Sequence, residues 1–292
     1  MVKEVKVKSI LNKHKKRDDW FLDDYSVNPY YGCSFNCIYC YIKGSKYGST
    51  ELAAKINAPE ILDRQLRHRA KKKEYGIIAL SSSTEPYMHV ERKFELTRMI
   101  LQKILKYRFP VEIATKSKLV LRDLDVLEKI DSTAILPTDL AQRLGRGVII
   151  SFSISTLDEE LAKIVEPGAP SPKERLETML KCKQEGFLVG VNYIPVLPFL
   201  SDSEEDLDEM IKTAKDYGAD YVLIGSLTLF GNEANDCKTL YYKFLEEYFP
   251  ELVPKYKSLF KNSFAPPKRY QAKLAEISEG LCEKHGIRSR IA

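Results

Sequence analysis

The sequence contains no apolar run long enough to cross a membrane. Its most apolar stretch, residues 189–200, is interrupted by Asn192, Pro195 and Pro198, whereas a spanning helix needs roughly 18 uninterrupted apolar residues. The first twenty residues are charged throughout and lack the apolar core of a secretory signal. These absences predict no membrane partner and a cytoplasmic protein.

Histidine is scarce, and the four histidines have no ligand-like spacing. The six cysteines do not indicate a disulfide scaffold, because a chain of 292 residues buries a sizeable core and, without an export signal, needs no covalent staples. No repeat of solenoid period is visible. Apolar residues make up 44% of the chain and charged residues 30%, which is typical of a globular protein.

The net charge of +5 is unevenly distributed along the chain. Residues 1–73 contain 16 Lys and Arg against 8 Asp and Glu, a balance of +8, whereas the remainder contains 30 against 33, a balance of −3. Basic runs at residues 14–17 and 67–73 are typical either of a solvated helix face or of a surface that contacts nucleic-acid phosphates. The charge pattern does not decide between these alternatives.

From residue 75 onward, short apolar runs alternate with amphipathic helical stretches, which indicates repeated βα units and a parallel sheet. Strands are predicted at residues 76–80, 111–114, 148–154, 188–193 and 221–225, and helices at 92–107, 121–129, 157–164, 172–184 and 204–217. Another strand just before residue 28 would give the sheet about six strands. A short separate strand is predicted at residues 5–10.

The pattern divides the chain into three parts. Residues 1–26 are predicted to be a lead-in, residues 27–230 the core, and residues 231–292 a helical extension packed on the core. The extension contains a group of aromatic residues, which we interpret as a packed cap rather than a platform for stacking bases: Tyr241, Tyr242, Phe244, Tyr248 and Phe249.

Three cysteines fall within eight residues of the segment NPYYGCSFNCIYCY at 28–41. Cys33, Cys37 and Cys40 converge only if the peptide folds around a common centre, and Gly32 permits the necessary turn. Structural zinc needs a fourth ligand, and no histidine lies between Cys40 and residue 68. Three soft thiolates with one open position suit a 4Fe-4S cluster. A zinc-binding structural protein is the alternative.

The loop resembles the signature of the radical S-adenosylmethionine (SAM) superfamily, C-x3-C-x-aromatic-C, with Tyr39 as the aromatic residue. Within that superfamily, the chain is similar over residues 5–230 to the group that includes spore photoproduct lyase. The similarity is carried further by SSSTEPY at 81–87, LTRMIL at 96–101, ATKSKLVLRDLDVL at 114–127, SFSIST at 151–156 and EPGAPSPKERL at 166–176.

The resemblance implies an α/β fold, a partial (β/α)6 TIM-type barrel with its cofactors, a 4Fe-4S cluster and SAM, at the C-terminal mouth of the strands. It implies reductive cleavage of SAM to a 5′-deoxyadenosyl radical, which abstracts hydrogen from an unidentified substrate. Such an enzyme would be of lyase or transferase type, with nucleic acid as one candidate substrate and a ferredoxin or flavodoxin as electron donor. The alternative is an iron-sulfur or electron-transfer protein that does not cleave SAM.

The resemblance also implies roles for single residues near SAM. Glu85 would receive the amino group and Lys116 the carboxylate, while Tyr39 would lie beside the cluster. Three further residues are expected at the cofactor: Ser153, Asn192 through ribose hydroxyls, and Arg175, which otherwise pairs with Glu166 or Glu177.

The remaining cysteines are interpreted as structural. The lyase group is expected to use a cysteine near the SSSTEP segment as hydrogen donor, but residues 81–84 contain no thiol. Cys237 is either a substitute donor or ligand, or a plain buried or surface cysteine, and we favour the plain cysteine. Cys182 and Cys282 lie in helical patterns and are predicted to pack in the core.

Overall fold

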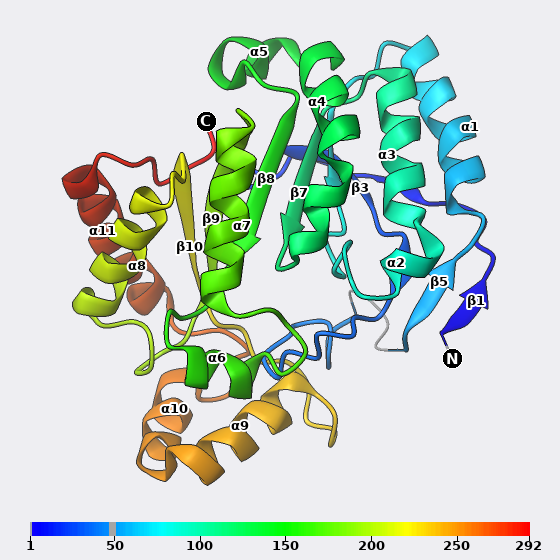
Figure 1. Cartoon of the computed structure of the whole chain (residues 1–292). Coiled ribbons are helices and arrows are strands. Elements are labelled where there is room, and N and C mark those ends of the chain that lie inside the picture. The colour runs from blue at the N-terminus through cyan, green and yellow to red at the C-terminus, as the bar shows by residue number, and fades with distance from the viewer. Residues whose placement is uncertain (1, 47–50) are drawn as a thin grey trace.

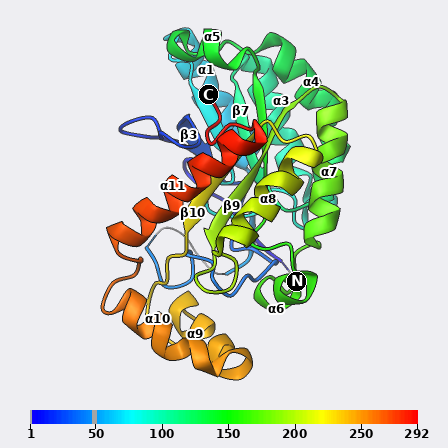
Figure 2. The same ribbon diagram turned by 90° about the vertical axis from the view of Figure 1, so that its left-hand side faces the viewer.

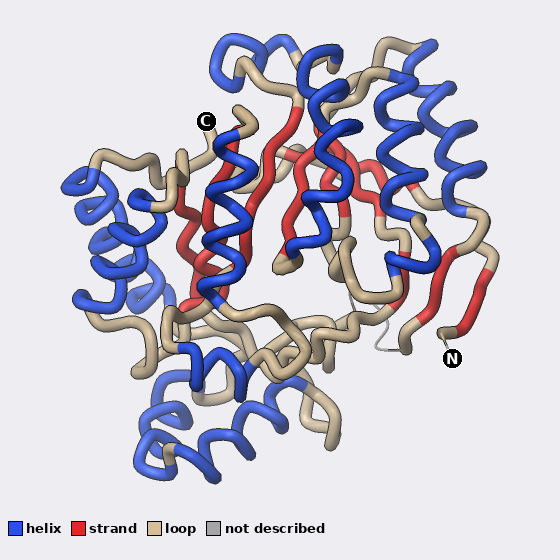
Figure 3. Tube along the Cα trace, in the orientation of Figure 1, coloured by secondary structure: helices blue, strands red, loops and turns tan. Residues whose placement is uncertain are grey.

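A computed structural model of the chain describes residues 2–46 and 51–292. Its centre is a seven-stranded sheet surrounded by helices (Figure 3). Six of the strands run parallel, and β2 joins one edge in the antiparallel sense. In spatial order the strands are β10 (Tyr221–Ser226), β9 (Leu188–Val196), β8 (Val148–Ser153), β7 (Val111–Thr115), β6 (Ile77–Leu80), β3 (Asp23–Val27) and β2 (Leu11–Lys13).

Strand residues alternate between the helix-facing side and the interior, because successive side chains of a strand point to opposite faces. In β8, Val148, Ile150 and Phe152 belong to the large core under the helices. Ile149 packs instead in a separate inner cluster with Leu188 of β9. The six parallel strands therefore form the partial barrel that the resemblance implied, and the strand predicted before residue 28 is β3.

Helices cover the outer face of the sheet (Figure 1). Their amphipathic patterns place apolar residues inward, as in α8, where Leu207, Met210, Ile211 and Ala214 are buried. The helices that follow the lead-in are α1 (Ala58–Lys71), α2 (Glu91–Phe94), α3 (Leu96–Tyr107), α4 (Leu124–Thr133), α5 (Thr138–Leu144), α6 (Glu159–Val165), α7 (Pro172–Gln184) and α8 (Glu204–Asp216).

Two local predictions were wrong. The helix predicted over 92–107 is broken at Glu95, whose φ is +50°, because the buried carboxylate of Glu91 turns back to accept the Thr97 N–H at 3.1 Å. The strand predicted over 5–10 is absent from the described residues. There the backbone of Val7 forms hydrogen bonds of 2.9 and 3.0 Å with the Asn57 side chain instead of with a strand. Two short strands, β1 (Lys3–Val5) and β2, lie before and after this segment.

A second, smaller sheet has the order β1-β5-β4, with β5 (Ala53–Lys55) between β1 and β4 (Tyr30–Tyr31). It lies beside the β2 edge of the barrel, since Asn57 and Gln65 of the segment after β5 bond to the backbone between β1 and β2. This placement joins the segments before and after the cysteine loop.

The C-terminal helices are α9 (Cys237–Tyr248), α10 (Val253–Phe260) and α11 (Lys268–His285). Helix α11 packs beside α8 and β10 (Figure 2), whereas α9 and α10 lie near α6 at the end toward which the strands run. Tyr241, Phe244 and Tyr256 are buried in one cluster with Phe35 and Tyr39 of the cysteine loop. Tyr241 and Phe244 of the predicted aromatic group therefore pack as a cap, whereas Tyr248 is 48% exposed. Within the described part of the chain, no helix combines the length and apolarity that a bilayer crossing requires.

Candidate cofactor site

The cysteine loop follows β4, and backbone hydrogen bonds fix it to the end of α6 and to the segment after α6. Gly32 turns the chain with φ of +64°. The Ile38 N–H donates to the Val165 carbonyl at 2.9 Å, and the Gly168 N–H donates to the Phe35 carbonyl at 2.9 Å. A Cβ at Gly168 would lie 2.5 Å from the Ser34 carbonyl oxygen, so only glycine permits this approach. Backbone contacts thus fix the loop that carries the three thiols.

All three cysteines are free and line a cavity of about 440 Å³ at the C-terminal ends of the strands, which we call the mouth cavity. They also line a second cavity of about 360 Å³ on the other side of the loop. Among the described residues, no three His, Cys, Asp or Glu side chains are grouped to hold a metal ion. The predicted residues that line the mouth cavity are Cys33, Cys37, Tyr39, Cys40, Glu85, Lys116, Ser153 and Asn192.

Burial governs the ionisation of the Cys33 and Cys37 thiols. It raises the pKa of Cys33 to about 12, to which the Glu85 charge contributes, and it raises the pKa of Cys37 further above the ordinary thiol value. Thiolates that ligate a metal are stabilised by the charge of the metal itself. The donor set consists of three soft ligands around a shared volume, and this fits an iron-sulfur cluster, in which each thiolate binds a different iron atom.

Glu85 lies in the loop after β6 and is buried. Its carboxylate accepts hydrogen bonds from the Tyr87 N–H at 3.0 Å, the Lys116 N–H at 2.9 Å and the Thr115 hydroxyl. Burial raises the pKa of Glu85 despite these three donors. A carboxylate offers about four acceptor positions, so one position of Glu85 remains for a cationic group in the cavity.

Lys116, directly after β7, joins a buried network centred on Glu166. Its ammonium is 3.0 Å from Glu166 and 3.4 Å from the Tyr39 hydroxyl, which in turn donates to Glu166 and bonds Ser155 at 2.9 Å. Arg175 pairs with the second oxygen of Glu166. Burial alone would raise the pKa of Glu166, but Lys116 and Arg175 outweigh it and lower the pKa to about 2. One carboxylate therefore faces two cations beside the cavity.

Arg175 does not line the mouth cavity. Its guanidinium donates to the carbonyls of Pro170 and Ser153, both at 2.9 Å, and to Glu166, and the residue is only 1% exposed. The sequence left open whether Arg175 faces the cofactor or pairs with Glu166 or Glu177, and the structure shows the pairing with Glu166.

Two residues that line the mouth cavity each have a polar side-chain atom that is buried without a partner among the described residues. These atoms are Oδ1 of Asn192 in β9 and Oγ of Ser81 in the loop after β6. A buried acceptor without a hydrogen bond is costly. Asn192 lines the mouth cavity beside Ser153, so a ligand hydroxyl placed there would satisfy it. The residues present therefore fit a polar cofactor as well as a cluster.

The other cysteines lie outside this arrangement. Cys182 in α7 and Cys282 in α11 are buried in the main core, as predicted. Cys237 is buried at the start of α9, where its sulfur accepts the Phe230 N–H at 3.1 Å, and it does not line the mouth cavity.

The basic runs also lie apart from the mouth cavity. Residues 67–73 occupy the end of α1 and the turn before β6, so they lie where the parallel strands begin, opposite the mouth (Figure 1). In the first run, Lys16 pairs with Asp19 at 2.7 Å and Arg17 with Asp24 at 3.1 Å. The structure therefore favours solvated surface over a nucleic-acid contact that leads to the cavity.

Residues 27–214 match the family model of the radical SAM superfamily. The chain belongs to the radical SAM superfamily. This membership identifies it as a radical SAM enzyme and implies a 4Fe-4S cluster and SAM as the cofactors, while it leaves the substrate open.

Curated relatives of this radical SAM chain are uncharacterized proteins. One from Mycobacterium tuberculosis is 29% identical over 273 residues, which cover 90% of this chain and 75% of that protein. One from the Acidianus two-tailed virus is 30% identical, covering 68% and 66% of the two chains. The match to the Mycobacterium tuberculosis protein is longer than the match to the family model.

Solved structures share the fold. A mutant of spore photoproduct lyase matches with a TM-score of 0.69 and 13% identity over 98% of this chain and 80% of that one. Streptococcus suis SuiB bound to S-adenosylmethionine matches with a TM-score of 0.51 and 15% identity over 80% of this chain and 47% of that one. At such identities the likeness shows the architecture and no more.

Sequence reasoning missed the central position of Glu166. It entered only as an alternative partner of Arg175, yet it also binds Lys116 and Tyr39. The segment EPGAP at 166–170 contained a signal for this role. Its Pro-Gly pair suffices to form a turn after the apolar helix, so the acidic residue before the pair is not needed for the turn. The partners that were missed lie far from Glu166 in the sequence, Tyr39 by 127 positions and Lys116 by 50.

Proposed function

We propose that this radical SAM enzyme holds a 4Fe-4S cluster through Cys33, Cys37 and Cys40 and binds SAM in the mouth cavity. The observation that supports this most strongly is that the three thiols line one cavity with Glu85, Lys116, Ser153 and Asn192. When bound, the cluster and SAM supply reductive cleavage of the sulfonium and abstraction of a hydrogen atom from the substrate.

The side chains around the cavity suit the polar groups of SAM. The free acceptor position of Glu85 would take the ammonium, and Lys116 would take the carboxylate, since two cations share the single charge of Glu166. Ser153 and the unpaired Oδ1 of Asn192 would meet hydroxyl groups. Arg175 and Tyr39 would act through Glu166 and orient Lys116 rather than contact the cofactor.

The cap formed by α9 and α10 covers the cysteine loop with buried aromatic residues. This apolar cover would exclude water and oxidants from the cluster side of the cavity. The reaction would be of lyase or transferase type, take place in the cytoplasm and draw electrons from a ferredoxin or flavodoxin. We favour a nucleic-acid or nucleotide substrate for the reason developed in the next section.

Replacement of the cysteines tests this proposal. Alanine at Cys33, Cys37 or Cys40, each made separately, is expected to abolish cluster absorbance and dithionite-dependent formation of 5′-deoxyadenosine after anaerobic reconstitution. Cys182→Ala is the matched control, because Cys182 is buried in α7 far from the loop in the fold, and it should retain both iron and activity. Full iron and sulfide content in all three loop variants would refute the assignment, and zinc in place of iron in the wild type would favour the structural alternative.

A further inference from the structure

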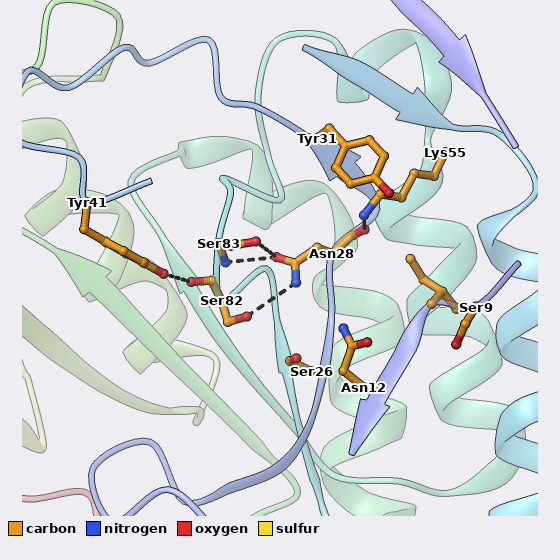
Figure 4. Close-up of a pocket in the computed structure, with 10 residues that line it drawn as sticks. Ser9, Asn12, Ser26, Asn28, Tyr31, Tyr41, Lys55, Ser82 and Ser83 are labelled. Atoms are coloured by element: carbon orange, nitrogen blue, oxygen red, sulfur yellow. Dashed lines mark hydrogen bonds between the residues drawn. The ribbon is translucent and has the colours of Figure 1, made fainter. Parts of the chain in front are cut away.

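A third cavity, of about 530 Å³, adjoins the mouth cavity on the side of β2 and the small sheet, and we call it the side pocket (Figure 4). Tyr41, Ser82 and Ser83 line both cavities and form the wall between them. The rest of its lining is mostly polar and includes Asn12, Ser26, Asn28, Tyr31 and Lys55.

Lys55, the last residue of β5, is the cation of the side pocket. It is 7% exposed, and its ammonium donates to the Asn28 carbonyl at 2.7 Å and lies 3.9 Å from the centre of the Tyr31 ring. An ammonium carries three N–H groups, so one of them remains free for a ligand. Among the described residues no carboxylate pairs with Lys55, and the residues outside the description contain neither Asp nor Glu.

A buried charge without a counter-charge is unfavourable. In agreement with the geometry, burial lowers the pKa of Lys55 to about 8. The surrounding groups are neutral: Asn28 accepts from the Ser83 N–H at 2.9 Å and the Ser83 hydroxyl at 3.0 Å, and it donates to Ser82 at 3.4 Å (Figure 4). This network links the lysine to the loop that borders the mouth cavity.

We propose that the side pocket binds a phosphate group of the substrate through Lys55 and so holds a nucleotide unit across Ser82 and Ser83 toward the mouth cavity. Lysine binds phosphate as a point charge, and Lys55 is the single charged side chain among the described residues that line the side pocket. The volume and the hydroxyl and amide groups of the lining suit a sugar and its phosphate rather than a carboxylate alone. This inference rests on the proposed function, because it assigns the substrate of that enzyme.

Calorimetric titration of the full-length protein with cytidine 5′-monophosphate, cytidine, inorganic phosphate and succinate tests the proposal at low salt. The monophosphate should bind roughly tenfold or more tightly than cytidine, as expected for a charge-assisted hydrogen bond to a buried lysine. Lys55→Met should remove this difference and Lys55→Arg should preserve most of it. Lys71→Met, at an exposed lysine in the last turn of α1, is the matched control and should bind as the wild type does.

A second variant keeps Lys55 in place. Asn12 is exposed on β2 and lines the side pocket (Figure 4), so Asn12→Asp adds a negative charge without disturbing the core and should weaken monophosphate binding about fivefold or more by repulsion. Equal binding of monophosphate and cytidine, no binding to the wild type, or binding unaffected by both Lys55→Met and Asn12→Asp would overturn the proposal. Succinate binding as tight as phosphate binding would overturn the choice of phosphate and indicate an acidic peptide.

These titrations need neither a cluster nor SAM cleavage. If phosphate binding fails while 5′-deoxyadenosine still forms, only the substrate assignment fails. If phosphate binds through Lys55 and no 5′-deoxyadenosine forms under dithionite, the proposed cofactor chemistry is refuted, while the assignment of the side pocket as a phosphate site is retained.

Discussion

Glu112 lies on the inner face of the barrel in β7, below the mouth cavity, and its carboxyl group is expected to be protonated at neutral pH. The residue is 2% exposed, and its carboxyl group accepts the Ser151 hydroxyl at 2.9 Å, which also bonds the Tyr221 hydroxyl at 2.7 Å. Burial raises the pKa of Glu112 from its ordinary 4.5 to about 8, with a smaller contribution from the charges of Asp23 and Asp18.

This shift sets the pH dependence of stability. The unfolded chain releases the Glu112 proton near pH 4.5 and the folded chain releases it near pH 8. The folded state therefore binds more protons within this window, and the free energy of unfolding falls as the pH rises through it. At about 1.36 kcal/mol per pKa unit, the loss is about 3 kcal/mol at pH 7 and about 5 kcal/mol above pH 8.

Glu112→Gln removes the ionisation and keeps an oxygen that accepts the Ser151 hydroxyl. It should stabilise the protein by about 3 kcal/mol at pH 7 and have little effect at pH 4.5. With an unfolding entropy near 2.1 cal/mol/K per residue over 292 residues, the melting temperature at pH 7 should rise by about 5 °C. Urea and thermal unfolding followed by circular dichroism at pH 5, 6, 7 and 8 measures both quantities.

The matched control is Glu276→Gln, at an exposed position of α11, which should change stability by less than about 0.5 kcal/mol at every pH. Stability curves of wild type and Glu112→Gln that stay parallel from pH 5 to pH 8 would refute the reasoning. They would mean that Glu112 is ionised in the folded barrel and that the inner face holds a charge without loss of stability.

Two further predictions concern the cofactor site. Asn192→Leu should raise the free energy of unfolding by about 1 kcal/mol, because it removes the unpaired buried Oδ1, yet it should weaken SAM binding roughly tenfold. Urea unfolding measures the first effect and calorimetric titration with SAM the second. Unchanged SAM affinity would exclude Asn192 as a contact. Gly168→Ala should cost about 1–3 kcal/mol and lower iron incorporation, because the new Cβ would lie 2.5 Å from the Ser34 carbonyl. Its control, Gly280→Ala in α11, meets no atom within 4 Å and should stabilise by about 1 kcal/mol; normal iron content in Gly168→Ala would contradict the buttressing role of residues 165–168.

The parallel strands were predictable because each has a local signature. Strands such as residues 148–153 and 188–196 are buried on both faces. A strand of this kind appears in the sequence as a run of consecutive, mostly apolar residues. The cysteine loop was predictable for the same reason, since its ligand spacing is local. The positions of Glu85, Lys116 and Ser153 followed once the strands were placed, because the carboxyl ends of parallel strands meet at one edge.

The features that sequence reasoning missed depend on contacts between distant residues. The break at Glu95 depends on Glu91, which accepts from Thr97 and pairs with Arg122 at 2.8 Å. The failed strand at 5–10 depends on two amide side chains fifty or more positions away. These contacts do not change the periodicity of apolar residues in the sequence. The hydrophobic pattern alone therefore predicted one continuous helix over 92–107 and a strand over 5–10.

Lys55 and Lys116 show the same limit at single residues. Each follows an apolar strand segment, and by position the two are alike. In the fold, Lys116 lies 3.0 Å from the carboxylate of Glu166, which itself depends on Arg175, whereas the described residues place only a carbonyl and an aromatic ring near Lys55. A lysine beside a carboxylate contributes to a fixed network, and a buried lysine without one attracts an anion. The difference between an internal network and a binding subsite thus arises from which distant residues the barrel brings to each ammonium.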